Sequence, residues 1–240
     1  MANYTLAQTL GWAESYIQGV PLTAWGASGG EPALTIASMI QATIDSPPFV
    51  WAHNRANPSY TFSTTAGVQD YPATLTNLGF VEKATVNDGT TTWELPDGAL
   101  NNSPLAASVT LARPSSLAVQ TSIPNTSQVF RLSAVPDAVY TVNVIYQMSP
   151  VLFTSTAQSW TAPNSFGYIY NNLFLGEAFA DVDEQRSQLY RQRGIAGLLA
   201  RSEGLTEVQK SIFAQHYLQY GVSTIVPTQR AQQAMQARSV

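Results

Sequence analysis

The chain has 240 residues, of which 45% are apolar, only 11% are charged and none is cysteine, and its net charge is −4. The lack of cysteine excludes disulfide frameworks, thiol nucleophiles and cysteine-based zinc sites. The two histidines, His53 and His216, lie too far apart in sequence to indicate a histidine-rich metal site. The charged fraction is less than half of the roughly 25% that is usual in soluble domains. A surface with so little charge repels other copies weakly and suits permanent contact between subunits.

The sequence also restricts location and partners. No apolar run approaches the roughly 18 residues of a membrane span. No basic segment precedes the first apolar residues, as a secretory signal would require. We therefore expect a protein that is made in a cytoplasm and does not contact a membrane. The modest acidity argues against a strong general affinity for nucleic acid, and nothing in the sequence indicates a cofactor or a metal.

Residues 1 to about 57 have the spacing of helices. Apolar residues recur every three or four positions, which predicts one helix that ends near Gly19 and a second from about Pro32 to about Asp45. The first apolar face consists of Leu6, Leu10, Ala13 and Ile17, and the second of Ile36, Ile40 and Ile44.

Residues 58 to 162 have the opposite period and predict short strands joined by turns. The clearest strand runs from Val139 to Gln147, where Tyr140, Val142, Val144 and Tyr146 share one face. Shorter alternating segments occur around Tyr60, Phe62 and Thr64, around Val109 and Leu111, and around Val129 and Arg131. Recurring turn signals between the strands favour an antiparallel sandwich or a small barrel.

Residues 163 to 221 return to helical spacing. A helix is expected to begin at Asn164 or Ser165, with Phe166, Tyr170, Leu173 and Phe174 as its apolar face. Gly194 and Gly197 argue against one unbroken helix in the next stretch. Thr206 and Gln209 have the spacing of a capping box, which predicts a last helix with Val208, Ile212, Phe213 and Tyr217. Residues 222–240 are polar and mildly basic, and we expect an extended tail there.

Charged side chains concentrate in this third region. The acidic group is Glu177, Asp181, Asp183 and Glu184, and the basic group that follows is Arg186, Arg191 and Arg193. Positions 177, 181 and 184 share a helical face, so a pair of these carboxylates would suit acid/base catalysis. The simpler interpretation is a solvated face whose acids pair with Arg186, with Arg191 or with a neighbouring subunit. We favour the second interpretation, because no catalytic motif surrounds these residues.

Other candidate sites are weaker. His53 lies beside Asn54 and Arg55, and a capping or hydrogen-bonding histidine is expected there rather than a general base. The glycine-rich stretch 26–30 lacks the spacing and the lysine of a phosphate-binding loop. In the predicted β region only Trp93 and Trp160 are available for a carbohydrate platform, so core or interface packing is favoured for the tryptophans.

Four stretches resemble the head-to-tail adaptor, or connector, proteins of tailed bacteriophages, including the tail-tubular adaptors of short-tailed phages. They are Thr61–Tyr71 after the Trp51–Arg55 segment, Val135–Pro150, Asn164–Leu173 and Tyr190–Leu199. The resemblance extends from about residue 32 to residue 220. Its motifs are structural in kind and include no reactive residue.

The resemblance implies an α+β fold without enzymatic activity. Residues 1–57 and 163–221 would form a helical, ring-building domain, residues 58–162 an inserted antiparallel β domain, and residues 222–240 a docking tail. The protein would be part of the virion at the head–tail junction, in a ring of usually twelve copies that binds the portal, receives a tail or nozzle protein and contacts genomic DNA transiently.

The resemblance also suggests roles for particular residues. The portal-docking candidates are Pro227, Gln229, Arg230, Gln233 and Arg238, and the candidates for a subunit interface or the channel are Glu177, Asp181, Glu184, Arg186, Arg191 and Arg193. Two alternatives stay open. One is a carbohydrate-binding or tail-spike-like module that uses Trp93 and Trp160, and the other is a cell-wall hydrolase that uses Glu177 or Asp181.

Overall fold

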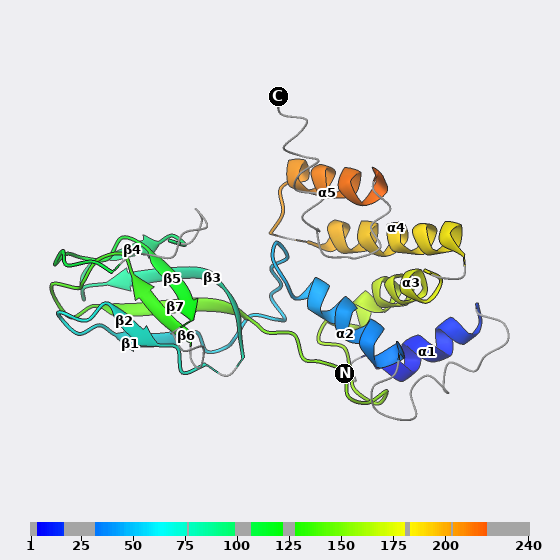
Figure 1. The fold of residues 1–240 in the computed structure, drawn as a ribbon, viewed down its shortest axis with the longest axis horizontal. Helices are drawn as coiled ribbons and strands as arrows, with labels where there is room; N and C mark the ends of the chain where they lie inside the picture. The colour runs from blue at the N-terminus through cyan, green and yellow to red at the C-terminus, as the bar shows by residue number, and fades with distance from the viewer. Residues whose placement is uncertain are drawn as a thin grey trace. The chain divides into compact units, whose positions relative to one another are not determined.

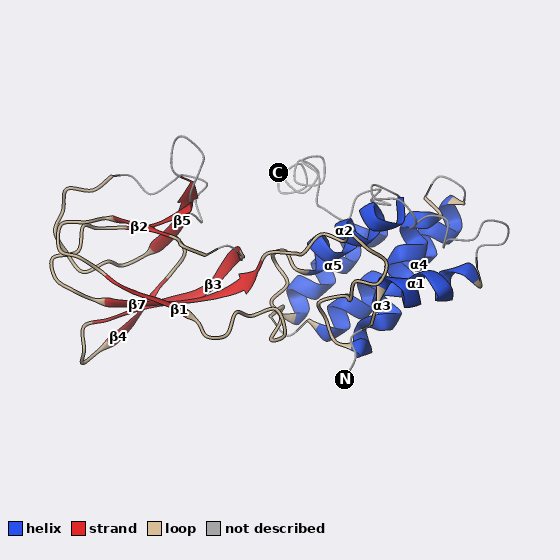
Figure 2. Ribbon diagram, turned by 90° about the horizontal axis from the view of Figure 1, so that it is seen from below, coloured by secondary structure: helices blue, strands red, loops and turns tan. Residues whose placement is uncertain are grey.

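The computed structural model describes residues 4–16, 32–75, 77–98, 107–121, 128–180, 183–202 and 204–219. The chain divides into two compact units (Figures 1 and 2). The helical unit consists of Met1–Asn54 and Pro150–Val240, and the β unit of Arg55–Ser149. The helices belong to the first unit and the antiparallel strands to the second, so the predicted α+β class is confirmed. The predicted tail, residues 222–240, lies outside the described residues.

The helical unit is built around α3 (Gly167–Ala178), which the 3-10 turn η2 (Asn164–Phe166) precedes. This helix packs against α1 (Leu6–Glu14), α2 (Pro32–Ile44) and α4 (Glu184–Arg201), and α5 (Glu207–Gln219) packs against α4 (Figure 1). Because α3 has neighbours on several sides, apolar side chains occupy most of its circumference. Its expected apolar face of Phe166, Tyr170, Leu173 and Phe174 is buried, as are Leu6, Leu10 and Ala13 of α1.

Two capping boxes begin helices of this unit. At α5 the amide of Thr206 donates to Gln209 Oε1 at 2.9 Å, and the amide of Gln209 donates to Thr206 Oγ1 at 3.3 Å. This confirms the predicted start of the last helix. Thr5 and Gln8 form the same reciprocal arrangement before α1. Both boxes satisfy backbone donors that no helix can satisfy internally.

The expected break at Gly194 and Gly197 is wrong, because α4 runs unbroken from Glu184 to Arg201. The two glycines lie where α4 crosses α3. A Cβ atom at Gly194 would be 2.6 Å from Leu173 Cγ, and one at Gly197 would be 3.0 Å from Ile169 Cγ1. The glycines therefore let the two helices approach closely, and this packing outweighs their weak helix propensity.

The segment Pro150–Ala162 belongs to the helical unit, whereas the sequence grouped it with the strands. Its backbone pairs with the N-terminal segment, since the amide of Trp160 donates to the Tyr4 carbonyl at 2.9 Å. The indole of Trp160 is fully buried and stacks on Tyr170 with ring centroids 4.0 Å apart. The segment is extended, which explains why its sequence resembles that of a strand, but it covers helices.

The β unit contains two antiparallel sheets. One has the order β1-β7-β3-β4 and the other the order β2-β6-β5. The strands are β1 (Tyr60–Ser63), β2 (Asp70–Pro72), β3 (Leu78–Asn87), β4 (Thr92–Leu95), β5 (Leu117–Thr121), β6 (Gln128–Leu132) and β7 (Thr141–Met148). The core lies between the sheets, where Phe62 of β1 stacks on Phe130 of β6 at 5.7 Å. This is the sandwich form of the predicted β region.

Strand β7 confirms the alternation expected around Val139–Gln147, because Tyr140, Val142, Val144 and Tyr146 are all buried. The strand predicted around Val109 and Leu111 is wrong. Leu111 forms only an isolated bridge with Val135, and Val109 is 96% exposed. Alternation by itself indicates a half-buried strand, but here nothing in the described part of the unit covers the apolar face.

Candidate functional site

Candidates for a functional site lie in four places. They are the charged groups of α3 and α4, the buried end of α2, an apolar groove beside α2, and the loops at one end of the β unit. Glu177 at the end of α3 and Arg191 in α4 form a bidentate pair. Arg191 Nε donates to Glu177 Oε1 at 3.1 Å, and Nη2 donates to Oε2 at 2.9 Å.

This pair lies inside the subunit. The side chains of Arg191 and Glu177 are only 15% and 9% exposed. Gly176, beside Glu177, allows the approach, because a Cβ atom there would be 2.5 Å from Arg191 Cγ. A buried bidentate pair holds two helices in register. Glu177 therefore has a structural partner, as expected of the simpler interpretation.

The remaining charged candidates mostly organise the start of α4. Asp183 caps this helix by accepting from the Arg186 amide at 3.0 Å, and its carboxylate lies 3.2 Å from Arg186 Nε. Glu184 accepts from Gln188 Nε2 at 3.1 Å, and the Arg193 guanidinium lies over the Tyr190 ring at 5.8 Å. Arg186 and Glu184 are exposed and stay candidates for a subunit interface or channel. Asp181 and all five portal-docking candidates lie outside the described residues.

A buried polar cluster at the end of α2 was not identified from the sequence. The Asp45 carboxylate is buried, and it accepts from Gln41 Nε2 at 2.5 Å and from Thr161 Oγ1 at 3.2 Å. Burial raises the pKa of Asp45 from 3.8 to about 6, against the opposing effect of these two hydrogen bonds. The cluster fastens the end of α2 to the extended segment 150–162. Only the tertiary contact with Thr161 distinguishes Asp45 from an ordinary residue at a helix end.

His53 packs as an aromatic ring. It stacks on Trp51 at 5.8 Å and meets the edge of Phe166 at 5.5 Å. Its Nε2 atom is buried and has no hydrogen-bond partner among the described residues, so the expected hydrogen-bonding role is not seen at this atom. Burial lowers the pKa of His53, which keeps the ring neutral near pH 7. Within the described ranges, no three acidic or histidine side chains gather as metal ligands would.

The tryptophan platform proposed for a carbohydrate module is not formed. Trp160 is fully buried in the helical unit. Trp93 is the other member of the predicted pair, and it lies in the β unit beneath the Arg113 guanidinium, 4.0 Å from the ring centroid. The two indoles belong to different units and do not share a sheet face.

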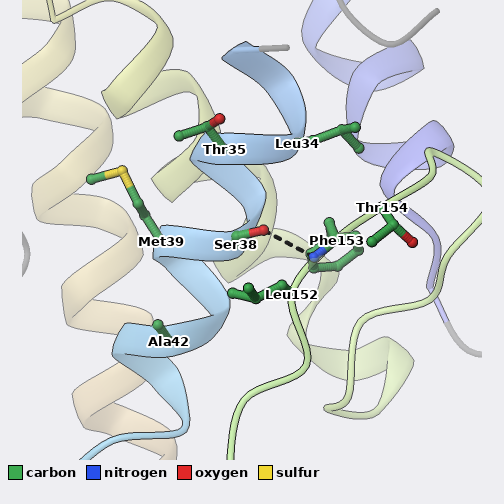
Figure 3. Close-up of a pocket in the computed structure, with 8 residues that line it drawn as sticks. All are labelled: Leu34, Thr35, Ser38, Met39, Ala42, Leu152, Phe153 and Thr154. Atoms are coloured by element: carbon green, nitrogen blue, oxygen red, sulfur yellow. Dashed lines mark hydrogen bonds between the residues drawn. The ribbon is translucent and has the colours of Figure 1, made fainter. Parts of the chain in front are cut away.

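An apolar groove lies beside α2 (Figure 3). It has a volume of about 540 Å³, and none of its lining residues is charged. Five of them come from α2 and three from the extended segment, and they are Leu34, Thr35, Ser38, Met39, Ala42, Leu152, Phe153 and Thr154. Met39 and Leu152 are exposed, and the amide of Phe153 donates to Ser38 Oγ at 2.9 Å across the floor of the groove.

Four exposed aliphatic residues of the β unit, which we call the aliphatic tip, are Val68, Val109, Leu111 and Val139, and the exposed residues Arg113 and Asp137 lie in the same loops. All four side chains are exposed. They come from three loops at the end of the sandwich where β1 ends, β2 begins and β7 begins. Val208 and Ile212 on α5 are a further pair of exposed aliphatic residues.

Comparisons of the sequence with models of known protein families and with curated proteins find no match. None of the helices in the described part of the chain is both long enough and apolar enough to cross a membrane.

Proposed function

We propose that this chain is a structural protein of a bacteriophage virion, one subunit of the ring that joins the portal to the tail. The observation that carries the proposal is the presence of two separate sets of exposed apolar residues on each copy, the uncharged groove and the aliphatic tip. A closed ring of identical subunits needs two different, complementary surfaces on each subunit. The resemblance of four stretches of the sequence to phage adaptors supplies the particular assembly.

The proposed mechanism is geometric. About twelve copies assemble on the portal, the ring receives a tail or nozzle protein on its far face, and the channel continues the path of the genome. The channel would contact DNA weakly, since strong phosphate contacts would slow its passage. Assembly would take place in the host cytoplasm, and the final location is the head–tail junction of the virion.

Residues 222–240 are proposed to dock into the portal. Their candidates Pro227, Gln229, Arg230, Gln233 and Arg238 combine hydrogen-bonding side chains with positive charge and include no acid. Glu184, Arg186 and Arg193 are proposed for contacts between subunits or for the channel wall. Glu177 and Arg191 are already engaged with each other inside the subunit, so we assign them to holding α3 against α4.

Native mass spectrometry of the purified chain, alone and with the candidate portal, tests the proposal. We expect a monomer or small oligomer by itself and a ring of about twelve copies once the portal is added. A chain that stays monomeric with the portal and binds a host polysaccharide would contradict the proposal and favour the carbohydrate-binding alternative. Hydrolysis of cell-wall glycan by the purified chain would favour the hydrolase.

A further inference from the structure

Four aromatic rings form a continuous cluster near the place where α1 and α3 end and α4 begins (Figure 1). The Trp12 ring lies against Tyr16 with centroids 4.5 Å apart, and Tyr16 meets Tyr190 of α4 at 6.2 Å. Tyr190 in turn stacks on Phe179, the residue after α3, at 5.9 Å. Phe179 is buried and Tyr16 is 46% exposed, so the cluster extends from the core of the helical unit to its surface.

Two arginine side chains of α4 lie on these rings. The Arg186 guanidinium is 5.7 Å from the centre of the Phe179 ring, and the Arg193 guanidinium is 5.8 Å from the centre of the Tyr190 ring. Both arginines are exposed. A guanidinium that packs on a ring keeps its in-plane N–H groups available as donors. Because the ring already restricts the side chain, less conformational entropy is lost when a partner binds it.

The two arginines belong to one face of α4. This face, which we call the arginine face, consists of Arg186, Leu189, Tyr190 and Arg193, whose spacing of three and four positions places them on the same side of the helix. Leu189 is 44% exposed and lies between the two arginines along this side. The arginines are two helical turns apart, a rise of about 10.5 Å. The arginine face therefore presents an apolar centre with a cation at each end.

Little negative charge balances the arginine face. The sequence from Gln185 to Ser202 contains four arginines and no acid. Asp183 lies 3.2 Å from Arg186 Nε, but both side chains are exposed, and exposed ion pairs of this kind contribute little. Among the described residues no carboxylate forms an ion pair with Arg193, and Glu14, the acid between Trp12 and Tyr16, is already engaged. The face is thus complementary to a partner that carries carboxylates.

We propose that the arginine face binds a helical segment of a partner protein whose apolar side chains are flanked by carboxylates. This inference rests on the proposed function, because it gives Arg186 and Arg193 a protein partner and removes them from the channel wall. Tyrosine and arginine are among the residues that contribute most to protein contacts. The spacing of three and four positions is that of helices that pack side by side. Each guanidinium would bind one carboxylate through two parallel hydrogen bonds.

Nucleic acid fits this surface less well. A protein that binds single strands by stacking needs rings that are open to the bases. Arg193 and Phe179 already contact the Tyr190 ring. Trp12 and Tyr16 already lie against each other. Two cations would also neutralise only about two phosphates, whereas two carboxylates seven positions apart on a partner helix match the separation of the arginines.

Fluorescence anisotropy with two labelled synthetic peptides tests the proposal on the full chain. The acidic peptide has three heptads with leucine at positions a and d and glutamate at positions e and g, so like charges keep it from pairing with itself. The control peptide has lysine in place of glutamate. The parent chain should bind the acidic peptide at least roughly tenfold more tightly than the lysine peptide, and its binding should weaken as salt is added.

Variants distinguish the arginine face from the general charge of the protein. Arg193→Gln should weaken binding of the acidic peptide at least roughly fivefold and reduce its dependence on salt. Leu189→Gln should also weaken binding but leave the salt dependence unchanged, because it removes only apolar contact. The matched control is Arg113→Gln in the β unit, an exposed arginine that lies 4.0 Å from the centre of the Trp93 ring. It should leave binding unchanged, and circular dichroism checks that each variant keeps its fold.

Three results would overturn the inference. One is equal affinity of the parent chain for the two peptides, and another is equal binding of the acidic peptide by the parent chain and Arg193→Gln. The third is binding of a single-stranded oligo-dT in place of the acidic peptide, which would indicate that this surface contacts nucleic acid in the channel.

Native mass spectrometry with the candidate portal tests the ring separately. Rings formed by a parent chain that does not bind the acidic peptide would overturn the inferred partner and leave the ring function in place. A chain that binds the peptide through Arg193 but never forms a ring would support the arginine face and contradict the ring. A chain that does neither would contradict both proposals.

Discussion

The guanidinium of Arg191 on α4 donates two hydrogen bonds to the carboxylate of Glu177 on α3, at 3.1 and 2.9 Å, across the contact between these two helices. The pair combines an acid from one predicted charged group with a base from the other. The sequence offered these acids either as catalytic groups or as a solvated face that pairs with Arg186, with Arg191 or with a neighbouring subunit, and the fold pairs Glu177 with Arg191 to join two helices of one chain.

Replacing Glu177→Ala should lower the free energy of unfolding by about 3 kcal/mol, because it leaves the largely buried Arg191 without its partner. Chemical denaturation monitored by circular dichroism measures the change. The double variant with Arg191→Ala should lose less than the sum of the two single variants.

The control for this variant is Glu184→Ala, an exposed acid in the first turn of α4 that should cost less than about 1 kcal/mol. Equal effects of the two variants would show that the Glu177 pair is not a structural contact. Loss of lytic activity in a Glu177→Ala protein of unchanged stability would instead support the hydrolase alternative.

Asp45 should make stability depend on pH. Its pKa is raised to about 6 in the folded protein from an ordinary value of 3.8, so the folded state binds the proton more strongly than the unfolded state. This contribution to stability is complete below about pH 4 and is lost as the pH rises to about 6, a loss of about 3 kcal/mol. Above that range it stays constant.

The variant Asp45→Asn isolates this effect, because it removes the titration and keeps the shape of the side chain. The free energy of unfolding of Asp45→Asn, relative to that of the parent chain, should rise by about 3 kcal/mol between pH 4 and pH 7. Urea denaturation of both chains at several pH values measures the difference, which cancels the contributions of the other carboxylates. If the free energies of unfolding of the two chains changed with pH in the same way over this range, the burial of a carboxylate at this site would be contradicted.

Two glycine variants test the approach of α3 to α4. In Gly194→Ala the new methyl group would lie 2.6 Å from Leu173 Cγ and 3.1 Å from the Leu173 amide nitrogen, so we expect a loss of about 1–3 kcal/mol from overpacking. In Gly11→Ala of α1 nothing lies within 4 Å of the new atom. That helix should therefore gain up to about 1 kcal/mol from the better helix propensity of alanine. Thermal unfolding should show a lower melting temperature for Gly194→Ala and a higher one for Gly11→Ala. Stabilisation by Gly194→Ala would contradict the close packing of α4 against α3.

A chain that ends at residue 221 should fail to assemble on the portal, because it lacks the proposed docking segment. Native mass spectrometry with the portal measures assembly, and circular dichroism of the shortened chain checks that its helices and strands are kept. The milder variant Arg230→Ala with Arg238→Ala keeps the length of the segment and should weaken assembly more at high salt than at low salt. Full assembly of the shortened chain would assign portal docking to another part of the protein.

The short-range features of this fold were determined by the sequence itself. The capping box of Thr206 and Gln209 begins α5 where its spacing predicts, and the alternation from Val142 to Tyr146 appears as β7. Hydrogen bonds between residues at most four positions apart and the two-residue period of a strand are local properties, so the local sequence predicts them.

What the sequence did not determine depends on contacts between distant segments. Trp160 has the sequence environment of a strand residue, yet it is buried against helices, because the extended segment around it pairs with the N-terminus. Asp45 becomes a buried acid only through Thr161, more than a hundred residues away. Gly194 looks like a helix breaker until α3 lies against it.

The surfaces that the proposed function would use were likewise decided by the tertiary structure. Val109 and Leu111 have the alternation of a buried strand, but nothing in the described part of the β unit covers them, and together with Val139 they form the tip. The groove exists because segment 152–154 lies beside α2. The local sequence determines which helices and strands form, because the stability of these elements comes from interactions between neighbouring residues. Only the packing of those elements decides which apolar side chains are left for a partner, because burial depends on the whole fold.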